Sequence, residues 1–370
     1  MEPNDTMEQQ PRITLNPVQD KNALLSLPLT TDERQWLTEQ LDVLSVMEQY
    51  QLAAAIRNTE SLKGLAGKAN SELLVSVLSG KQDVAVDAIN CILDLRTYEV
   101  CFPAGTYADL GRYYLTYEST APDEVARFLD LEQLGRQFAQ RHPGIFVDDC
   151  YVQNPNIFLI PSYKGRELPS PGNMDWSVRL KLASPAVPDG VWLKLPDYSE
   201  AREGRPDEIH LALHALGASS IRECTLLDAR CVLPEVQNLM DTYWDIEGLL
   251  QDGNNLGYML DEQGQGLPHF TEILRGALAL EHCNTVPMAL EIGQNLRCYD
   301  FVHQSIVGAY ARKEIQGDAL VSQCLDHAAY GAYLLQQQGY QKTESGSYIR
   351  RNDQAFQLGR GPTPLEMATL

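Results

Sequence analysis

The chain has 370 residues, of which 44% are hydrophobic and 21% are charged, a composition typical of folded proteins and sufficient for two or three domains. Fifty acidic residues against 29 basic ones give a formal net charge of −21, which argues against direct binding of DNA or RNA phosphates. We find no run of 18 apolar residues and no signal-peptide pattern, so we expect a cytoplasmic protein without a membrane contact.

Eight cysteines are scattered along the chain without any CxxC pair, and most have apolar neighbours. In a chain of this length the pattern predicts reduced cysteines that act as small buried hydrophobic residues. They are Cys91, Cys101, Cys150, Cys224, Cys231, Cys283, Cys298 and Cys324.

The first part of the chain is predicted to be rich in helices. Residues 1–22 are polar and lack periodicity, which indicates a disordered tail. A helix is expected after Thr31, its candidate N-cap, with one apolar face formed by Trp36, Leu37, Leu41 and Leu44. Apolar residues at three- and four-residue spacing predict further helices as far as residue 93.

The amino-acid composition changes after residue 155, where prolines and glycines interrupt any helical pattern. We assign residues 156–175 to a linker and expect strands in "WSVRLKLASPAV" and "GVWLKLP". A helix is predicted in "PDEIHLALHALG", a strand in "IRECTLLDARC" and helices in "YWDIEGLLQDGNNLGYMLDEQ", with "DGNN" as a turn or helix start. Residues 353–370 are expected to be a second disordered tail.

Two distant segments of the chain match over about sixty residues in the same order. The matched pairs are Leu95 with Leu296, Arg96 with Arg297, Tyr98 with Tyr299, Gly111 with Gly308, Tyr113 with Tyr310, Asp130 with Asp326, Gly135 with Gly331 and Tyr151 with Tyr348. Such residues serve packing and turns more than chemistry. We interpret the chain as a tandem duplication of small mixed helix and strand domains, an α+β fold with copies at residues 23–155 and 176–352.

The first copy resembles the C-terminal part of ArdA-type antirestriction proteins, especially the divergent, often duplicated forms from mobile elements of Firmicutes. The resemblance rests on Tyr98-Glu99, on "LGRYY" at 110–114, on "LEQLGR" at 131–136 and on Cys150-Tyr151-Val152. The second copy keeps Cys298-Tyr299-Asp300, but its later motifs are degraded to "VGAYARKE" and "HAAYGAYL". "VWLKLP", "ECTLLDARC" and "NNLGYML" are similar to the N-terminal part of the family.

This resemblance implies an elongated, acidic, mainly α+β protein without enzymatic activity. It would imitate bent duplex DNA and occupy the DNA-binding groove of a type I restriction-modification enzyme. It would thereby protect an incoming mobile element, without a cofactor. A duplex carries one charge per about 1.7 Å, so a net charge of −21 falls short of a DNA-sized mimic, and a homodimer would narrow the gap. The alternative is an interaction or regulatory module of a conjugative element that keeps the fold without DNA mimicry.

The acidic residues are concentrated in one part of the chain. Residues 201–300 carry 16 acids and 6 bases, whereas residues 151–200 carry five of each. The best candidates for a partner-binding acidic face are Asp241, Asp245, Glu247, Asp252, Asp261 and Glu262. An ordinary solvated helix face is the competing interpretation.

We find little sign of catalytic chemistry. His210 and His214 lie one helical turn apart but lack the glutamate of HExxH, so we expect one buried and one exposed histidine and no metal. Nucleotide-binding loops, a serine-hydrolase elbow and EF-hand spacing are all missing from the sequence.

Overall fold

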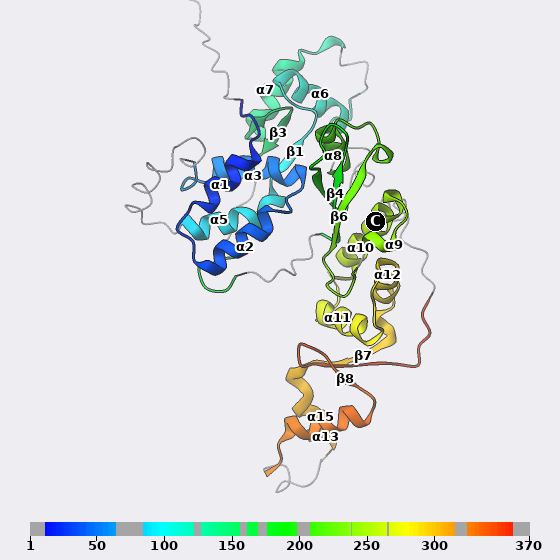
Figure 1. The fold of residues 1–370 in the computed structure, drawn as a ribbon. Helices are drawn as coiled ribbons and strands as arrows, with labels where there is room; N and C mark the ends of the chain where they lie inside the picture. The colour runs from blue at the N-terminus through cyan, green and yellow to red at the C-terminus, as the bar shows by residue number, and fades with distance from the viewer. Residues whose placement is uncertain are drawn as a thin grey trace, which may run out of the picture. The chain divides into compact units, whose positions relative to one another are not determined.

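The structure is a computed structural model that describes residues 12–63, 84–121, 127–155, 161–168, 176–197, 208–237, 239–264, 266–314 and 324–357. It is an α+β protein in which helices accompany three small three-stranded sheets (Figure 1). Contacts divide it into two compact units: unit 1 is Met1–Asn173 with Lys181–Leu227, and unit 2 is Met174–Leu180 with Asp228–Leu370. Residues 181–227 are therefore grouped with unit 1, whereas the sequence analysis assigned them to the second copy.

Unit 1 begins with a group of helices, blue to cyan in Figure 1: α1 (Pro17–Leu25), α2 (Thr31–Leu41), α3 (Val46–Asn58) and α5 (Val84–Leu93). The predicted apolar face of α2 is buried, but Thr30 and not Thr31 is the N-cap, because it forms a capping box with Glu33. Ser45 and Glu48 form a second capping box at the start of α3. These boxes satisfy backbone donors that a helix start leaves open.

The first repeat segment, residues 84–153, continues from α5 through the 3₁₀ turn η1 (Leu95–Thr97) into β1 (Glu99–Cys101). Helices α6 (Tyr107–Tyr117) and α7 (Leu131–Arg141) follow, and then the hairpin of β2 (Gly144–Val147) and β3 (Cys150–Gln153). The antiparallel sheet has the order β1-β3-β2. Its core is aromatic and consists of Cys101, Ala104, Leu110, Tyr113, Phe138, Phe146 and Tyr151.

Two glycines let α6 and α7 approach until their backbones touch. A Cβ on Gly135 would overlap the carbonyl oxygen of Tyr107, and one on Gly111 would overlap that of Leu131. The sequence interpretation of Gly111 and Gly135 as close-packing residues is therefore confirmed.

Three strands form the sheet of order β5-β4-β6: β4 (Val178–Ala183), β5 (Val191–Lys194) and β6 (Thr225–Cys231). All three coincide with predicted strands. Helix α8 (Glu208–Leu216) and the 3₁₀ turn η3 (Ile221–Glu223) lie between β5 and β6 in the chain, and α8 ends before Gly217 (φ +61°), as the sequence predicts.

Unit 2 contains α9 (Leu239–Thr242), α10 (Ile246–Gly264), α11 (Phe270–Leu280) and α12 (Val286–Gln294). The prediction of a turn or helix start at "DGNN", residues 252–255, is wrong, because these residues lie inside α10. Gly253 is buried there, and its carbonyl accepts a hydrogen bond from Ser177 Oγ at 2.6 Å. Tertiary packing thus overrides the local turn preference.

The second repeat segment, residues 286–351, has the same order of described helices and strands as the first, with one additional 3₁₀ turn, η5. After α12 come η4 (Leu296–Cys298), β7 (Tyr299–Val302), η5 (Gln304–Ile306), α13 (Val307–Glu314), α15 (His327–Gln337), β8 (Gln341–Lys342) and β9 (Tyr348–Arg351). Its sheet has the order β7-β9-β8, equivalent to β1-β3-β2. A smaller core consists of Val302, Val307, Leu335 and Tyr348.

The strand registers of the two segments also agree. Cys101 pairs with Tyr151 in the first segment and Val302 pairs with Tyr348 in the second, which matches the sequence alignment of Tyr151 with Tyr348. The common order and register are what a duplicated unit would produce. Descent from a duplication, and the elongated shape, stay interpretations.

The packing shifts the alignment of α13 with α6, which affects the pairs Gly111 with Gly308 and Tyr113 with Tyr310. A Cβ on Gly331 would overlap the carbonyl oxygen of Val307, the first residue of α13, just as Gly135 opposes Tyr107, the first residue of α6. One turn beyond Val307 stands Ala311, fully buried, so Ala311 and not Gly308 occupies the position of Gly111.

The prediction of a disordered tail over residues 1–22 is wrong for residues 17–22, because they belong to α1, whose start Asn16 caps and whose Asp20 and Leu24 are buried. Residues 1–11 and 358–370 lie outside the described residues, as do 156–160 and 169–175 of the predicted linker. Among the described helices, none is both long and apolar enough to cross a membrane.

Candidate functional site

The six predicted acidic residues lie on one helical stretch of unit 2. Asp241 is in α9, Asp245 precedes α10, and the other four, Glu247, Asp252, Asp261 and Glu262, are in α10 itself. Glu247 and Asp261 are 14 positions apart, which is about 21 Å along a helix. The structure therefore forms two acidic groups, one around the start of α10 and one towards its end.

Four of the six side chains are exposed: Asp241, Asp245, Glu247 and Glu262. Asp252 and Asp261 are half-buried, and Asp252 accepts a hydrogen bond of 2.7 Å from the hydroxyl of Tyr243. Burial, together with that carboxylate, raises the pKa of Tyr243, which keeps its hydroxyl a donor. Asp245 accepts the backbone N–H of Gly248 at 2.6 Å, so it also holds the start of α10. Asp245 and Asp252 thus have structural roles of their own.

The sequence around these residues contains acidic side chains but no Lys or Arg. Residues 231–274 contain eight acids and neither Lys nor Arg. Trp244 lies among the acids at the start of α10 and is fully exposed, at 101% of its reference area, with Met240 exposed to 43% nearby in the sequence. Exposed aromatic side chains of this kind are typical anchors of protein-binding surfaces. We call Met240, Asp241, Trp244, Asp245 and Glu247 the Trp244 surface.

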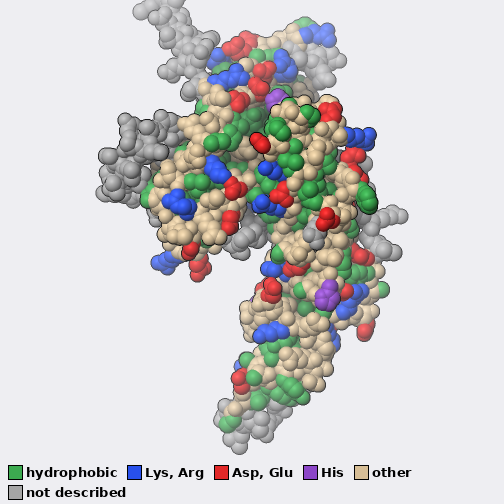
Figure 2. All heavy atoms as spheres, viewed as in Figure 1, with side chains coloured by type: hydrophobic (Ala, Val, Ile, Leu, Met, Phe, Trp, Pro, Cys, Tyr) green, Lys and Arg blue, Asp and Glu red, His purple; other side chains and the backbone are tan. Residues whose placement is uncertain are grey.

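The face drawn in Figure 2 carries charges of both signs. On the face drawn in Figure 2, Lys and Arg side chains of the described residues are interspersed with the carboxylates. That face shows no unbroken band of carboxylates over the part of the chain that the structure describes. The single-sign segment is therefore a local feature.

The histidine pair of α8 differs from the prediction, because both His210 and His214 are exposed. His214 Nε2 lies 3.6 Å from Asp149 Oδ2, and its ring lies against Phe102 with 4.9 Å between the ring centroids. Within the described residues, neither histidine belongs to a group of three ligands at metal-binding distances.

The cysteine prediction is confirmed for five of the eight. Cys91, Cys101, Cys150, Cys283 and Cys298 are buried, Cys224 and Cys231 are half-buried, and Cys324 is exposed; all are free thiols. Burial raises the pKa of Cys91 to about 12, so its thiol is unreactive.

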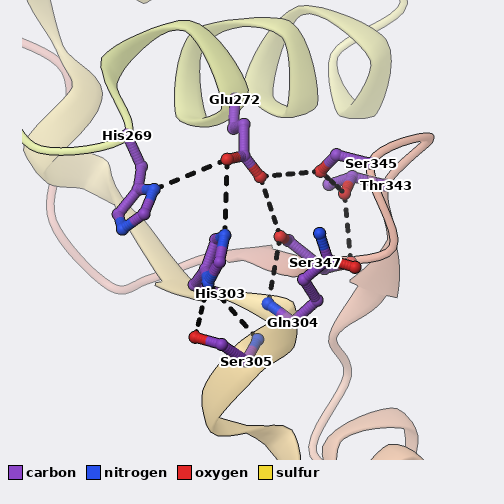
Figure 3. A network of polar contacts seen from close by, with 8 residues as sticks. All are labelled: His269, Glu272, His303, Gln304, Ser305, Thr343, Ser345 and Ser347. Atoms are coloured by element: carbon purple, nitrogen blue, oxygen red, sulfur yellow. Dashed lines mark hydrogen bonds and ion pairs between the residues drawn. The ribbon is translucent and has the colours of Figure 1, made fainter.

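A polar cluster that the sequence analysis did not identify joins α11 to the second repeat segment (Figure 3). His269 precedes α11, Glu272 lies in its first turn, and His303 follows β7. His269 Nδ1 lies 3.4 Å from Glu272 Oε1, and His303 Nε2 lies 3.5 Å from the same oxygen. The two imidazole rings stack with 4.2 Å between their centroids.

The hairpin between β8 and β9 holds the other oxygen of Glu272. Ser345 Oγ donates to Glu272 Oε2 at 2.8 Å, and Ser347 Oγ donates to it at 2.9 Å. These hydrogen bonds, that of Ser345 first, lower the pKa of Glu272 below its usual value of 4.5, and so do the neighbouring histidines. A fixed carboxylate with two imidazoles beside it can bind a proton or a divalent cation.

Only a weak signal of this cluster is present in the sequence. His269 and Glu272 are three residues apart, the spacing of neighbours on a helix face. His303 comes 31 residues after Glu272, and only the pairing of β7 with β9 brings it close to the serines of the hairpin.

Comparisons with family models, with curated proteins and with solved structures found no match to this chain. The likeness to ArdA-type proteins accordingly rests on the motifs quoted above.

Proposed function

We propose that this chain is a non-enzymatic, cytoplasmic anti-defence protein that binds a DNA-processing enzyme of the type I restriction-modification class through the Trp244 surface and the rest of α10. The observation that carries the proposal is the 44-residue segment 231–274, which has eight acids and no Lys or Arg. A surface on which carboxylates outnumber basic side chains attracts a positively charged DNA-binding groove.

The charges of α10 alone are too few to replace DNA. Over the roughly 21 Å from Glu247 to Asp261, duplex DNA carries roughly twelve charges, whereas this stretch of α10 contains three carboxylates. We therefore assign much of the affinity to Trp244, whose exposed indole can fill an apolar pocket, and assign speed and orientation of docking to the carboxylates.

A second candidate is a protein-binding module of a mobile element that keeps the fold without DNA mimicry. The mixed charges on the face drawn in Figure 2 favour it. In that case the Trp244 surface binds a different basic partner, and binding is independent of any restriction enzyme.

The decisive experiment is a plasmid-restriction assay in cells that carry a defined type I restriction enzyme, together with salt-dependent binding to the purified enzyme. The test variant combines Asp241→Asn, Glu247→Gln and Glu262→Gln, three exposed acids of the predicted face, and keeps Asp245 and Asp252, which make the hydrogen bonds described above. The control combines Asp32→Asn, Glu39→Gln and Glu60→Gln, exposed acids of unit 1 with the same change in charge.

We expect the wild type and the control to rescue the unmodified plasmid and the test variant to rescue it less. Binding should weaken as salt rises, because exposed charges are screened. Equal rescue by the test variant and the control would reject the acidic residues of the Trp244 surface and α10 as the binding site. If the wild type neither rescues the plasmid nor binds the enzyme, the anti-defence function is rejected and the second candidate is favoured.

A further inference from the structure

We propose that His269, Glu272 and His303 form a binding site for one divalent transition-metal ion, with Zn²⁺ as the ion of choice for a test. A search of the described residues for three or more potential metal ligands (His, Cys, Asp or Glu side chains) finds these three, whose ligand atoms all lie within 4.8 Å of one another. The site goes beyond the proposed function, because none of its three residues is among the six predicted acidic residues and the proposed function involves no metal ion.

The distances between the ligand atoms fit a zinc ion. Zinc binds imidazole nitrogen and carboxylate oxygen at about 2.0–2.2 Å in tetrahedral geometry, so two ligands of one ion lie roughly 3.3–3.5 Å apart. The two histidine nitrogens lie 3.4 and 3.5 Å from Glu272 Oε1. An ion could therefore be accommodated with small side-chain rotations.

The ligand types narrow the choice of ion. Two imidazoles with one carboxylate suit zinc, copper, nickel or iron(II), whereas magnesium and calcium prefer oxygen ligands. Three protein ligands leave a fourth tetrahedral position for water or for a group of a partner.

Neighbouring side chains already hold the ligands in position. Ser345 and Ser347 fix Glu272 Oε2 and leave Oε1 directed at the histidines (Figure 3). The Ser305 backbone N–H donates to His303 Nδ1 at 3.3 Å, which places the imidazole proton on Nε2 in the neutral ring. Metal binding through Nε2 requires the ring proton on Nδ1, where a hydrogen bond donated to Ser305 Oγ, 2.7 Å away, would replace the one accepted from the backbone N–H.

The backbone of His269 adds a further constraint. It has φ +59°, a left-handed conformation that a histidine adopts rarely, and this conformation places the imidazole over Glu272 and His303 (Figure 3). A metal ion would connect the first turn of α11 with the end of β7, and Glu272 already connects that turn with the β8–β9 hairpin. The ion would thus join α11 to the sheet of the second repeat segment.

The test measures zinc affinity of the full chain, stripped of metal, by competition with a chromophoric chelator, and metal content after gel filtration. We expect one zinc per chain. Glu272→Gln and His303→Ala should each lower the affinity at least about tenfold, and Ser305→Ala should lower it less. Zinc should also raise the thermal unfolding midpoint of the wild type but not that of Glu272→Gln.

A matched pair of histidines provides the control. His282, like His269, is exposed and has a positive φ of 55°, and asparagine tolerates this conformation at both positions. His269→Asn should lose zinc affinity and His282→Asn should keep it. The proposal would be overturned if the wild type does not bind one equivalent of zinc, or if the ligand variants bind zinc with the same affinity as the wild type. An equal loss of zinc affinity in His269→Asn and His282→Asn would overturn it as well. Glu272→Gln preserves the shape of the side chain, so the test does not depend on the histidine variants folding.

Discussion

The two repeat segments have the same order of elements and the same strand register, yet different interiors. In the first segment an aromatic core fills the space between α6, α7 and the sheet. In the second the core is smaller, β8 has only two residues, and polar side chains occupy the end of the sheet. The comparison teaches that turns, caps and close helix packing fix the order of elements, while the interior is free to diverge.

The largest difference should appear at the strand positions that pair with the two matched tyrosines, Tyr151 and Tyr348. Phe146 pairs with Tyr151 and is buried, whereas Lys342 pairs with Tyr348 and is exposed. Phe146→Ala should lower the free energy of unfolding by about 3–5 kcal/mol, because it leaves a cavity between Tyr107 and Tyr151. Lys342→Ala should change it by less than about 0.5 kcal/mol. Urea unfolding monitored by tyrosine fluorescence measures both, and similar effects would mean that the two interiors are equally packed.

The next difference concerns the helix pairs. Gly135→Ala should destabilise by about 1–3 kcal/mol or more, since the new methyl group overlaps the backbone of α6. Gly308→Ala should stabilise by about 0.5–1 kcal/mol, because alanine favours the helix and its Cβ would have room, with His327 Cβ at 3.6 Å as the nearest atom. Thermal unfolding followed by circular dichroism checks both signs. A destabilising Gly308→Ala would support the original alignment of Gly308 with Gly111.

A smaller effect is expected from a charge pair that the second segment has and the first lacks. Arg350 donates to Asp300 at 2.8 and 2.9 Å, and the equivalent strand pair in the first segment is Glu99 with Gln153. Asp300→Asn should cost about 0.2–1 kcal/mol, since both side chains are more than a third exposed. The loss should diminish in high salt. A loss that does not change with salt would indicate that packing of Arg350 on Tyr340 matters more.

The smallest effect involves pH and Glu272. Its pKa is lowered in the folded protein, so its contribution to stability is present above the usual value of 4.5 and disappears as the pH falls through the lower, folded-state pKa. In the presence of a chelator, wild type and Glu272→Gln should therefore differ most near neutral pH and converge below 4.5, with a difference of less than about 1 kcal/mol. Unfolding midpoints at a series of pH values test this. A difference that grows as the pH falls would contradict the assigned sign.

Much of the fold could be predicted from local patterns, because capping residues, apolar spacing and strand alternation act within a few residues. The apolar face of α2, the strand β4 and the stop of α8 at Gly217 are examples. The extension of α10 through Asp252 could not be predicted, since burial of Gly253 by distant residues decides it.

The candidate sites were predictable to a smaller extent. Charge counting located the acidic stretch, but the capping role of Asp245 and the full exposure of Trp244 depend on the chain path around α10. A tryptophan is usually buried to a large extent, so sequence alone would place Trp244 in a core. The cluster of Glu272 and His303 arises from strand pairing, which single-sequence patterns do not reveal.

The segment 231–274 also has a practical consequence for handling the protein. The last lysine before it is Lys194 and the next after it is Lys313, and no arginine interrupts the segment itself. Amine-reactive dyes and amine coupling to a sensor surface will therefore attach outside α9 and α10 and leave their side chains unmodified. Trypsin, which cleaves after lysine and arginine, will likewise release Cys231 to Arg275 as one peptide of 45 residues. This peptide contains the Trp244 surface and the whole of α10.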